Sequence, residues 1–154
     1  MSLLEARRIF ETYLAAQNLK HSRPRLQVME SFIAAGEHLT AEELHRRVKR
    51  KFPHIGVATV YRTLKLMHAG GLCGELKLQD GTTRYEALCG RDHHDHLICT
   101  RCGRLEEVVD PDIEALQGKL FKRHGYRPQW HRLELYGLCG SCLKKSAAPG
   151  TQEG

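Results

Sequence analysis

Four of the six cysteines occur as two closely spaced pairs, Cys99 with Cys102 and Cys139 with Cys142. A tight turn over two intervening residues can direct both thiolates of a pair at one tetrahedral ion, and the second pair completes the shell. In a reducing cytosol such pairs are typical of metal ligands rather than disulfides. Because four cysteines leave no open coordination position, the pattern predicts a structural zinc ion. The alternative is four free thiols with fortuitous spacing.

A second group of ligand-type residues is continuous in the sequence: His93, His94, Asp95 and His96. If this stretch is extended, His94 and His96 share one face, and His93 and Asp95 share the other. The alternation indicates two metal sites rather than one; the alternative is a solvated histidine-rich loop. Further residues that could complete these sites are Glu86, Glu107, Glu114, His131 and, from the first half of the chain, His38.

A helix with the features of a DNA-recognition element is predicted over residues 57–69. It has small residues at its N-terminus, and Val60 and Leu64 form an apolar back. A recognition helix needs polar and cationic groups that approach base edges from its N-terminal part. Candidates for that role are Thr59, Tyr61, Arg62 and Lys65. The preceding basic run would supply charge for phosphates, or form a solvated surface: Arg46, Arg47, Lys49, Arg50 and Lys51.

The charge of the chain is unevenly distributed. The 154 residues include 24 Lys and Arg against 18 Asp and Glu, a formal net charge of +6. Residues 1–88 carry a net +5, whereas residues 89–154 carry +1. No apolar run approaches the roughly 18 residues that span a bilayer, and Glu5 interrupts the region where a signal peptide would be apolar. We therefore expect a soluble, cytoplasmic protein with a basic first half and no membrane partner.

Hydrophobic periodicity predicts four helices in the first half, over residues 3–18, 22–36, 40–52 and 57–69. Thr40 and Glu43 form a capping-box signature at the start of the third helix. Two alternating segments follow, with Asp80 and Gly81 between them, and this combination indicates a β-hairpin over residues 72–78 and 82–88. Helices followed by a hairpin are typical of a winged helix-turn-helix domain; the alternative is a small helical bundle with a β appendix.

The pattern of residues in the second half of the chain predicts a mixed α/β domain. Strands are expected over residues 96–100 and 105–109, a helix opened by Asp110 and Pro111 up to Gly125, and an extended segment over 126–138. The predicted class is therefore α+β. The expected division is a winged-helix domain (1–88), a hinge (89–92), a metal-binding domain (93–145) and a flexible tail (146–154).

Taken together, the motifs described above resemble the ferric uptake regulator (Fur) family over about Leu14 to Cys142. The resemblance implies a homodimer that binds double-stranded DNA through winged-helix domains and dimerises through the α/β domain. It implies a repressor without enzymatic activity and without a small-molecule substrate. The strings that carry it are His38 before Thr40-Ala-Glu-Glu-Leu44, Gly56-Val-Ala-Thr-Val-Tyr-Arg-Thr-Leu64, Tyr85-Glu86 and His93-His-Asp-His-Leu-Ile-Cys-Thr-Arg-Cys-Gly103.

The same resemblance assigns residues to three metal sites and to DNA. It implies a structural zinc on the four cysteines. The regulatory site at the domain joint would use His38, Glu86, His94, His96 and Glu107. The additional site in the dimerisation domain would use His93, Asp95, Glu114 and His131. DNA contacts would come from Tyr61 and Arg62 on the recognition helix, and from Lys20 in the minor groove.

The identity of the sensed metal depends on the ligand chemistry. Nitrogen and oxygen ligands without sulfur suit Fe(II) or Mn(II), and the Fur-type set favours Fe(II) and control of iron homeostasis at A·T-rich palindromic operators. Mn(II) or Zn(II) are possible substitutes. Peroxide-sensing relatives carry Asp where this chain has Glu86 and Glu107. Zinc-sensing relatives place a thiolate in the joint site, and Cys89 lies there, although Cys89 and Cys73 are also interpretable as buried free thiols.

Two other function classes explain less of the sequence. A metallo-hydrolase could use the His-Asp-His cluster with Glu107 as base, but it requires an open coordination position and a substrate pocket. The chain has no catalytic signature such as H-E-x-x-H. A zinc-ribbon binding module accounts for the cysteines and leaves the nine further ligands unexplained. The sequence therefore favours a metal-dependent DNA-binding regulator.

Overall fold

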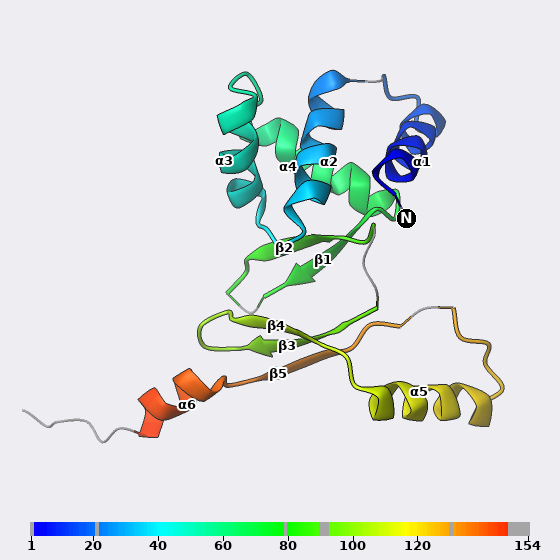
Figure 1. The fold of residues 1–154 in the computed structure, drawn as a ribbon, viewed down its shortest axis with the longest axis vertical. Helices are drawn as coiled ribbons and strands as arrows, with labels where there is room; N and C mark the ends of the chain where they lie inside the picture. Colours follow the sequence, from blue (N-terminus) through cyan, green and yellow to red (C-terminus); the bar gives the residue numbers. More distant parts are fainter. Residues whose placement is uncertain (1, 21, 79, 90–92, 130, 148–154) are drawn as a thin grey trace, which may run out of the picture. The chain divides into compact units, whose positions relative to one another are not determined.

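The computed structural model describes residues 2–20, 22–78, 80–89, 93–129 and 131–147. The chain divides into two compact units, residues 1–91 and residues 92–154. Within the described residues, the first unit contains helices α1–α4 and a two-stranded sheet, and the second contains a three-stranded sheet with α5 and α6 (Figure 1). This order confirms the predicted α+β class. The expected hinge at 89–92 lies, from residue 90 on, outside the described residues.

The helices of the first unit begin where the sequence provides caps. Thr40 and Glu43 form the predicted capping box of α3, and the Ser2 hydroxyl caps α1. Ser22 occupies the N-cap position of α2 without a side-chain hydrogen bond, and Gly36 ends that helix with a positive φ of 62°. The bounds are α1 Leu3–Ala16, α2 Arg23–Ala35, α3 Ala41–Lys51 and α4 Val57–Ala69.

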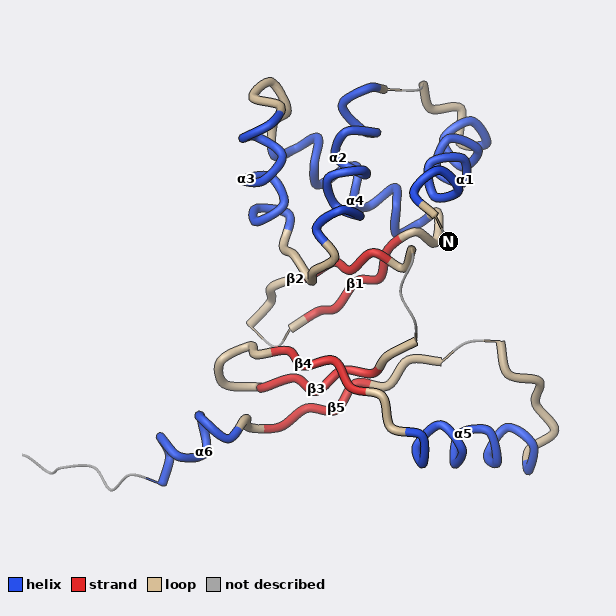
Figure 2. Tube along the Cα trace, in the orientation of Figure 1, coloured by secondary structure: helices blue, strands red, loops and turns tan. Residues whose placement is uncertain are grey.

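The hairpin of the first unit pairs β1 (Cys73–Lys77) with β2 (Thr83–Ala87) in antiparallel register. The four helices cluster on one side of this hairpin (Figure 2). Leu39, between α2 and α3, forms an isolated antiparallel bridge with Tyr85, so the helices and the hairpin are joined by backbone hydrogen bonds. Each large apolar side chain in the core between them stabilises the fold by about 1.5–3 kcal/mol. The largest include Phe10, Leu14, Met29, Phe32, Leu44, Leu64 and Met67.

The second unit is built on a sheet in the order β4-β3-β5. Strands β3 (Asp95–Cys99) and β4 (Leu105–Val108) are antiparallel, whereas β3 and β5 (Glu134–Gly137) are parallel. Helix α5 (Pro111–Arg123) lies in the connection between β4 and β5, and the Asp110 carboxylate caps it by accepting from the N–H groups of Asp112 and Ile113. Helix α6 (Gly140–Ala147) follows β5 directly.

The second unit differs from the sequence-based expectations in three respects. Of the described residues in the extended segment expected over 126–138, only Glu134–Gly137 form a strand, and Pro128 in the earlier part has no N–H to donate to a ladder. Helix α6 was not predicted, because eight residues form no stable helix by themselves. The flexible tail was expected to begin at residue 146, but α6 continues to Ala147. Residues 148–154 lie outside the described part. No helix in the described residues is long and apolar enough to cross a membrane.

Candidate metal centres and nucleic-acid interface

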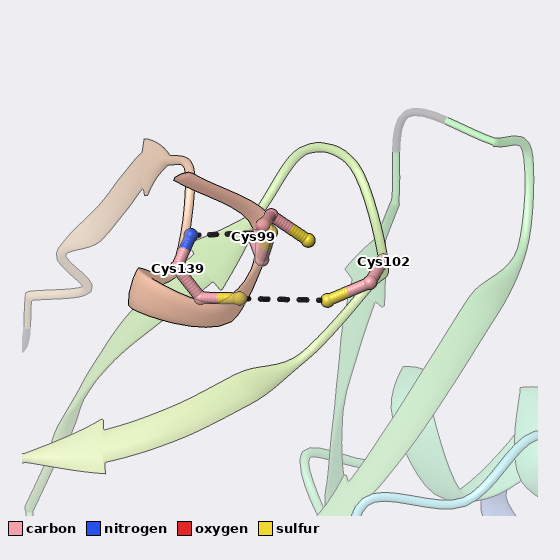
Figure 3. A group of neighbouring side chains, drawn as sticks. Cys99, Cys102 and Cys139 are labelled. Atoms are coloured by element: carbon pink, nitrogen blue, oxygen red, sulfur yellow. Dashed lines mark hydrogen bonds between the residues drawn. The ribbon is translucent and has the colours of Figure 1, made fainter. Parts of the chain in front are cut away.

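The four cysteines converge at one end of the second unit. Cys99 ends β3, Cys102 lies in the next turn, and Cys139 and Cys142 flank the start of α6. Their sulfurs all lie within 4.8 Å of one another, and the Cys102 and Cys139 sulfurs point at each other across 3.7 Å (Figure 3). Zinc–sulfur bonds of about 2.3 Å give tetrahedral sulfur–sulfur edges of about 3.8 Å. The Cys102–Cys139 separation matches such an edge, and the four sulfurs together could form a zinc shell.

Backbone groups prepare this cluster for a cation. The N–H of Cys139 donates to Cys99 Sγ over 3.3 Å, and with the N–H of Cys102 it lowers the pKa of Cys99 to about 6. The N–H of Cys142 lowers the pKa of Cys139 in the same way. Burial and the neighbouring cysteines raise the pKa of Cys142 to about 12. Without a cation, the four neighbouring thiols therefore resist losing all their protons. A bound cation would stabilise the thiolates and allow all four to ionise.

The second set of four candidate ligands also converges. His93 Nε2 and His131 Nε2 lie 3.1 and 3.2 Å from the same oxygen, Glu114 Oε1. Asp95 Oδ1 is buried, receives no hydrogen bond from the described residues, and lies 3.4 Å from His93 Nε2. Metal–ligand bonds of about 2.0–2.2 Å give tetrahedral ligand–ligand edges of about 3.4 Å. Two imidazoles and two carboxylates at these spacings fit a divalent cation.

Part of the predicted regulatory set lies in the first unit. His38 Nε2 and Glu86 Oε2 are 2.8 Å apart, and both side chains are largely buried. Glu86 lies opposite Gly74 in the β1–β2 register, and a Cβ at that glycine would lie 3.1 Å from Glu86 Oε1. Gly74, which the sequence analysis did not single out, therefore leaves room for the carboxylate.

The rest of the regulatory set lies in the second unit. His94 and His96 have ring centroids 5.0 Å apart in an edge-to-face arrangement. His96 is buried and pairs with Glu107 across β3 and β4, which places both side chains on one face of the sheet. His93 and Asp95 point to the other set, as the alternation of an extended chain predicts. The structure thus brings together two separate parts of the predicted set, one in each unit.

The candidate reading face lies on α4. Tyr61 and Arg62 are exposed, Thr59 is half-buried, and Val60 and Leu64 face the core as predicted. Gly56 at the N-cap provides no side-chain hydrogen bond, and the first turn has no acidic residue. The N-terminus of α4 therefore has neither a side-chain cap nor a carboxylate that would compete with a phosphate for its positive dipole.

Basic residues outside α4 add to this interface. Arg46, Lys49 and Arg50 are exposed on α3, and Lys20 is exposed between α1 and α2. The Lys20 carbonyl accepts a hydrogen bond of 3.0 Å from Arg25 Nη1, which holds the backbone at that position. These cations give the first unit the charge that duplex DNA attracts.

The two remaining cysteines are buried in the core of the first unit. Cys73 Sγ points at the Leu64 carbonyl oxygen, 3.5 Å away, and burial raises the pKa of the Cys73 thiol to about 12. Cys89 Sγ lies 3.9 Å from the Leu72 carbonyl oxygen, and burial raises its pKa as well. Neither thiol belongs to a group of candidate metal ligands among the described residues, so the packing favours free thiols at both positions.

Comparison with known proteins connects these features to one family. The model of the ferric uptake regulator family matches residues 16–136. The chain belongs to this family. It is 40% identical over 133 residues to the ferric uptake regulation protein of Neisseria meningitidis, a match that covers 86% of this chain and 92% of the relative. As a Fur-family protein it is a metal-responsive, DNA-binding transcription regulator and not an enzyme.

Solved structures of the family have the same fold. The Fur protein of Helicobacter pylori, described as having three functional metal binding sites, superposes with a TM-score of 0.78 at 26% identity, covering 93% of this chain and 95% of that one. The iron-containing Fur structure of Francisella tularensis gives a TM-score of 0.67 at 32% identity, covering 81% and 95%.

Proposed function

We propose that this Fur-family regulator is an Fe(II)-dependent repressor that controls iron homeostasis by binding A·T-rich palindromic operators as a homodimer in the cytoplasm. The observation that carries the proposal is the distribution of the regulatory ligands. His38 and Glu86 belong to the unit that presents α4, and His94, His96 and Glu107 belong to the unit with the cysteine cluster. An ion bound by all five would tie the position of the reading helix to the second unit.

The donor set supports iron at this site. Three imidazoles and two carboxylates, without sulfur, suit Fe(II) or Mn(II) in five- or six-fold coordination. The four cysteines would instead hold zinc, whose preference for thiolates is stronger. The additional set, which comprises His93, Asp95, Glu114 and His131, would take a second divalent ion inside the second unit. The relative from Neisseria meningitidis is named for ferric uptake, and the Francisella tularensis structure contains iron.

In this proposal the metal ion affects DNA binding because it binds one arrangement of the protein more tightly than another. A metal ion shifts an equilibrium between two arrangements only if it binds one arrangement more tightly. His38 and Glu86 provide that difference, because they complete the shell only when their unit is suitably placed. Coupling between sites is typically about 1–3 kcal/mol, or about 5–150-fold in affinity, and it is reciprocal. Operator DNA should therefore raise the metal affinity by the same factor.

Exposed apolar residues of the second unit support the homodimer. None of the α5 residues is buried, and Leu116 and Leu120 are 62% and 55% exposed. Helices α5 and α6 extend from opposite ends of the sheet, which they leave uncovered (Figure 1). A second copy would cover this surface and place two α4 helices for successive half-sites of a palindrome. Further exposed apolar residues of the unit are Leu97, Leu135, Tyr136 and Leu138.

Anaerobic titrations with an operator duplex, selected by repeated binding from a random library, test the proposed metal. We expect Fe(II) to raise operator affinity about 5–150-fold, with Mn(II) as a stable substitute, while the metal content of the same samples is measured. Activation by Zn(II) at concentrations where Fe(II) has no effect would identify a zinc sensor instead. Operator binding that is independent of every added metal would contradict the proposal.

Replacing Tyr61 or Arg62 by alanine should weaken operator binding by about 1–3 kcal/mol, the usual cost of losing a direct base contact. Both side chains are exposed on α4, so the fold, the metal content and the dimer should stay near wild type. Fluorescence anisotropy with the operator and with an unrelated duplex gives the loss of specificity. Arg127→Ala, an exposed arginine between α5 and β5, is a matched control. Unchanged operator affinity in both α4 variants would show that this helix does not read the DNA.

A further inference from the structure

We infer that Arg84 is a positioning residue that couples the His38–Glu86 ligand pair to the N-terminus of α3, and through α3 to the DNA-reading helix. The inference deepens the proposed function and rests on the assignment of His38 and Glu86 to a metal. All contacts that carry it lie within the first unit.

Three consecutive residues of β2 contact the segment before α3. Arg84 Nη1 donates to the His38 carbonyl oxygen over 3.0 Å. Tyr85 and Leu39 exchange two backbone hydrogen bonds of 2.8 and 2.9 Å. The Glu86 carboxylate lies 2.8 Å from the His38 ring. The hairpin therefore holds His38 in three ways. Arg84 binds its carbonyl oxygen, Tyr85 pairs with the backbone of the next residue, and Glu86 contacts its ring.

Arg84 also contacts the cap of α3. Its Nη1 lies 3.4 Å from Glu43 Oε2, the oxygen that accepts the N–H of Thr40 over 2.8 Å. The Thr40 hydroxyl in turn accepts the N–H of Glu43 over 3.1 Å. One guanidinium group thus contacts both the residue that carries the metal-ligating ring and the carboxylate that completes the capping box. Both contacts come from Nη1, which the planar guanidinium holds in place, whereas the Nζ of a lysine sits on a more flexible stem.

These contacts form a short path from the metal ligands to the reading helix. His38 is separated from the N-cap of α3 by Leu39 alone, so a restraint on the His38 ring also restrains the start of α3. Helix α3 packs on α4 through Leu44 and Val48 in the core of the first unit. Fixing His38 would therefore orient both helices of the helix-turn-helix, and Arg84 makes the connection rigid.

The test compares Arg84→Met and Arg84→Lys with Arg7→Met in the full-length, zinc-containing protein. Arg7 is the matched control, because it is also an arginine of the first unit that pairs with carboxylates, Glu11 at 3.0 Å and Glu30 at 3.7 Å, but these partners lie on α1 and α2. The first measurement is amide hydrogen exchange without added Fe(II) or Mn(II). The second is the ratio of operator affinities with and without Mn(II).

In Arg84→Met we expect faster exchange at the amides of Leu39 and Tyr85, and a fall of about tenfold in the Mn(II)-dependent affinity ratio, the size of one lost charge-assisted hydrogen bond. Arg84→Lys should be intermediate, and Arg7→Met should match wild type. Unchanged amide exchange together with an unchanged affinity ratio in Arg84→Met would overturn the inference. Exchange that accelerates at core amides such as Leu64 as much as at Leu39 and Tyr85 would also overturn it, because it means general destabilisation. A wild-type protein without any metal response would refute the proposed function, whereas the exchange measurement would still decide whether Arg84 holds His38.

Discussion

Replacing Cys142 by serine should release one zinc ion per chain and unfold the second unit. Within the described part of that unit, the buried residues are Asp95, His96, Ile98, Cys99 and Cys142, so little apolar burial remains to hold it together without the ion. Binding free energy at structural zinc sites is folding free energy, about 10–16 kcal/mol at pH 7 in small zinc domains. A neutral serine hydroxyl does not replace the thiolate.

Zinc content by mass spectrometry, near-UV circular dichroism and size-exclusion chromatography measure this loss. Cys73→Ala is the control, because Cys73 is equally buried but belongs to the core of the first unit and should leave the zinc bound. A Cys142→Ser protein that remains a folded dimer without zinc would remove the structural role of the cluster.

Replacing His96 by alanine should abolish metal-stimulated operator binding while the zinc of the cysteine cluster stays bound. His96 and Asp95 are neighbours on β3, both are buried, and they point to opposite faces. In the proposed arrangement, only the His96 side joins His38 and Glu86 of the DNA-binding unit. Asp95→Ala is therefore the matched variant. It should reduce metal-stimulated operator binding less and should mainly lower the stability of the dimer, because the partners of Asp95 all lie within the second unit: His93, Glu114 and His131.

Operator binding with and without Mn(II), and dimer dissociation by analytical ultracentrifugation, separate the two variants. The expected loss in His96→Ala is the whole coupling factor of about 5–150-fold. Equal loss of metal-stimulated binding in both variants, with dimer stability unchanged, would mean one fused site and would refute the coupling of the two units through His38.

Local signals in the sequence predicted most of the helices and strands. The capping box of Thr40 and Glu43, the Asp110-Pro111 start of α5 and the Asp80-Gly81 turn act over a few residues, so their effect does not depend on the rest of the fold. Helix α6 was missed for the opposite reason. Its eight residues follow Cys139 and include Cys142, so the helix depends on the cluster that joins it to β3.

The ligand sets were also predictable in part from spacing. Two residues between cysteines, and alternation along an extended chain, are local geometric constraints, and the structure brings the members of the cysteine set and of the His93 set within 4.8 Å of one another. Their assignment to metals remains a proposal.

Only the tertiary structure decided which residues support the ligands. Gly74 makes room for Glu86 across a strand register, and Arg84 reaches His38, 46 positions away in the sequence, through the Leu39–Tyr85 bridge. Neither residue has a local signature, because each acts on a partner that is distant in the chain and close in space. Likewise, only the folded chain shows that Cys73 and Cys89 belong to none of the candidate ligand groups among the described residues, which no spacing rule reveals.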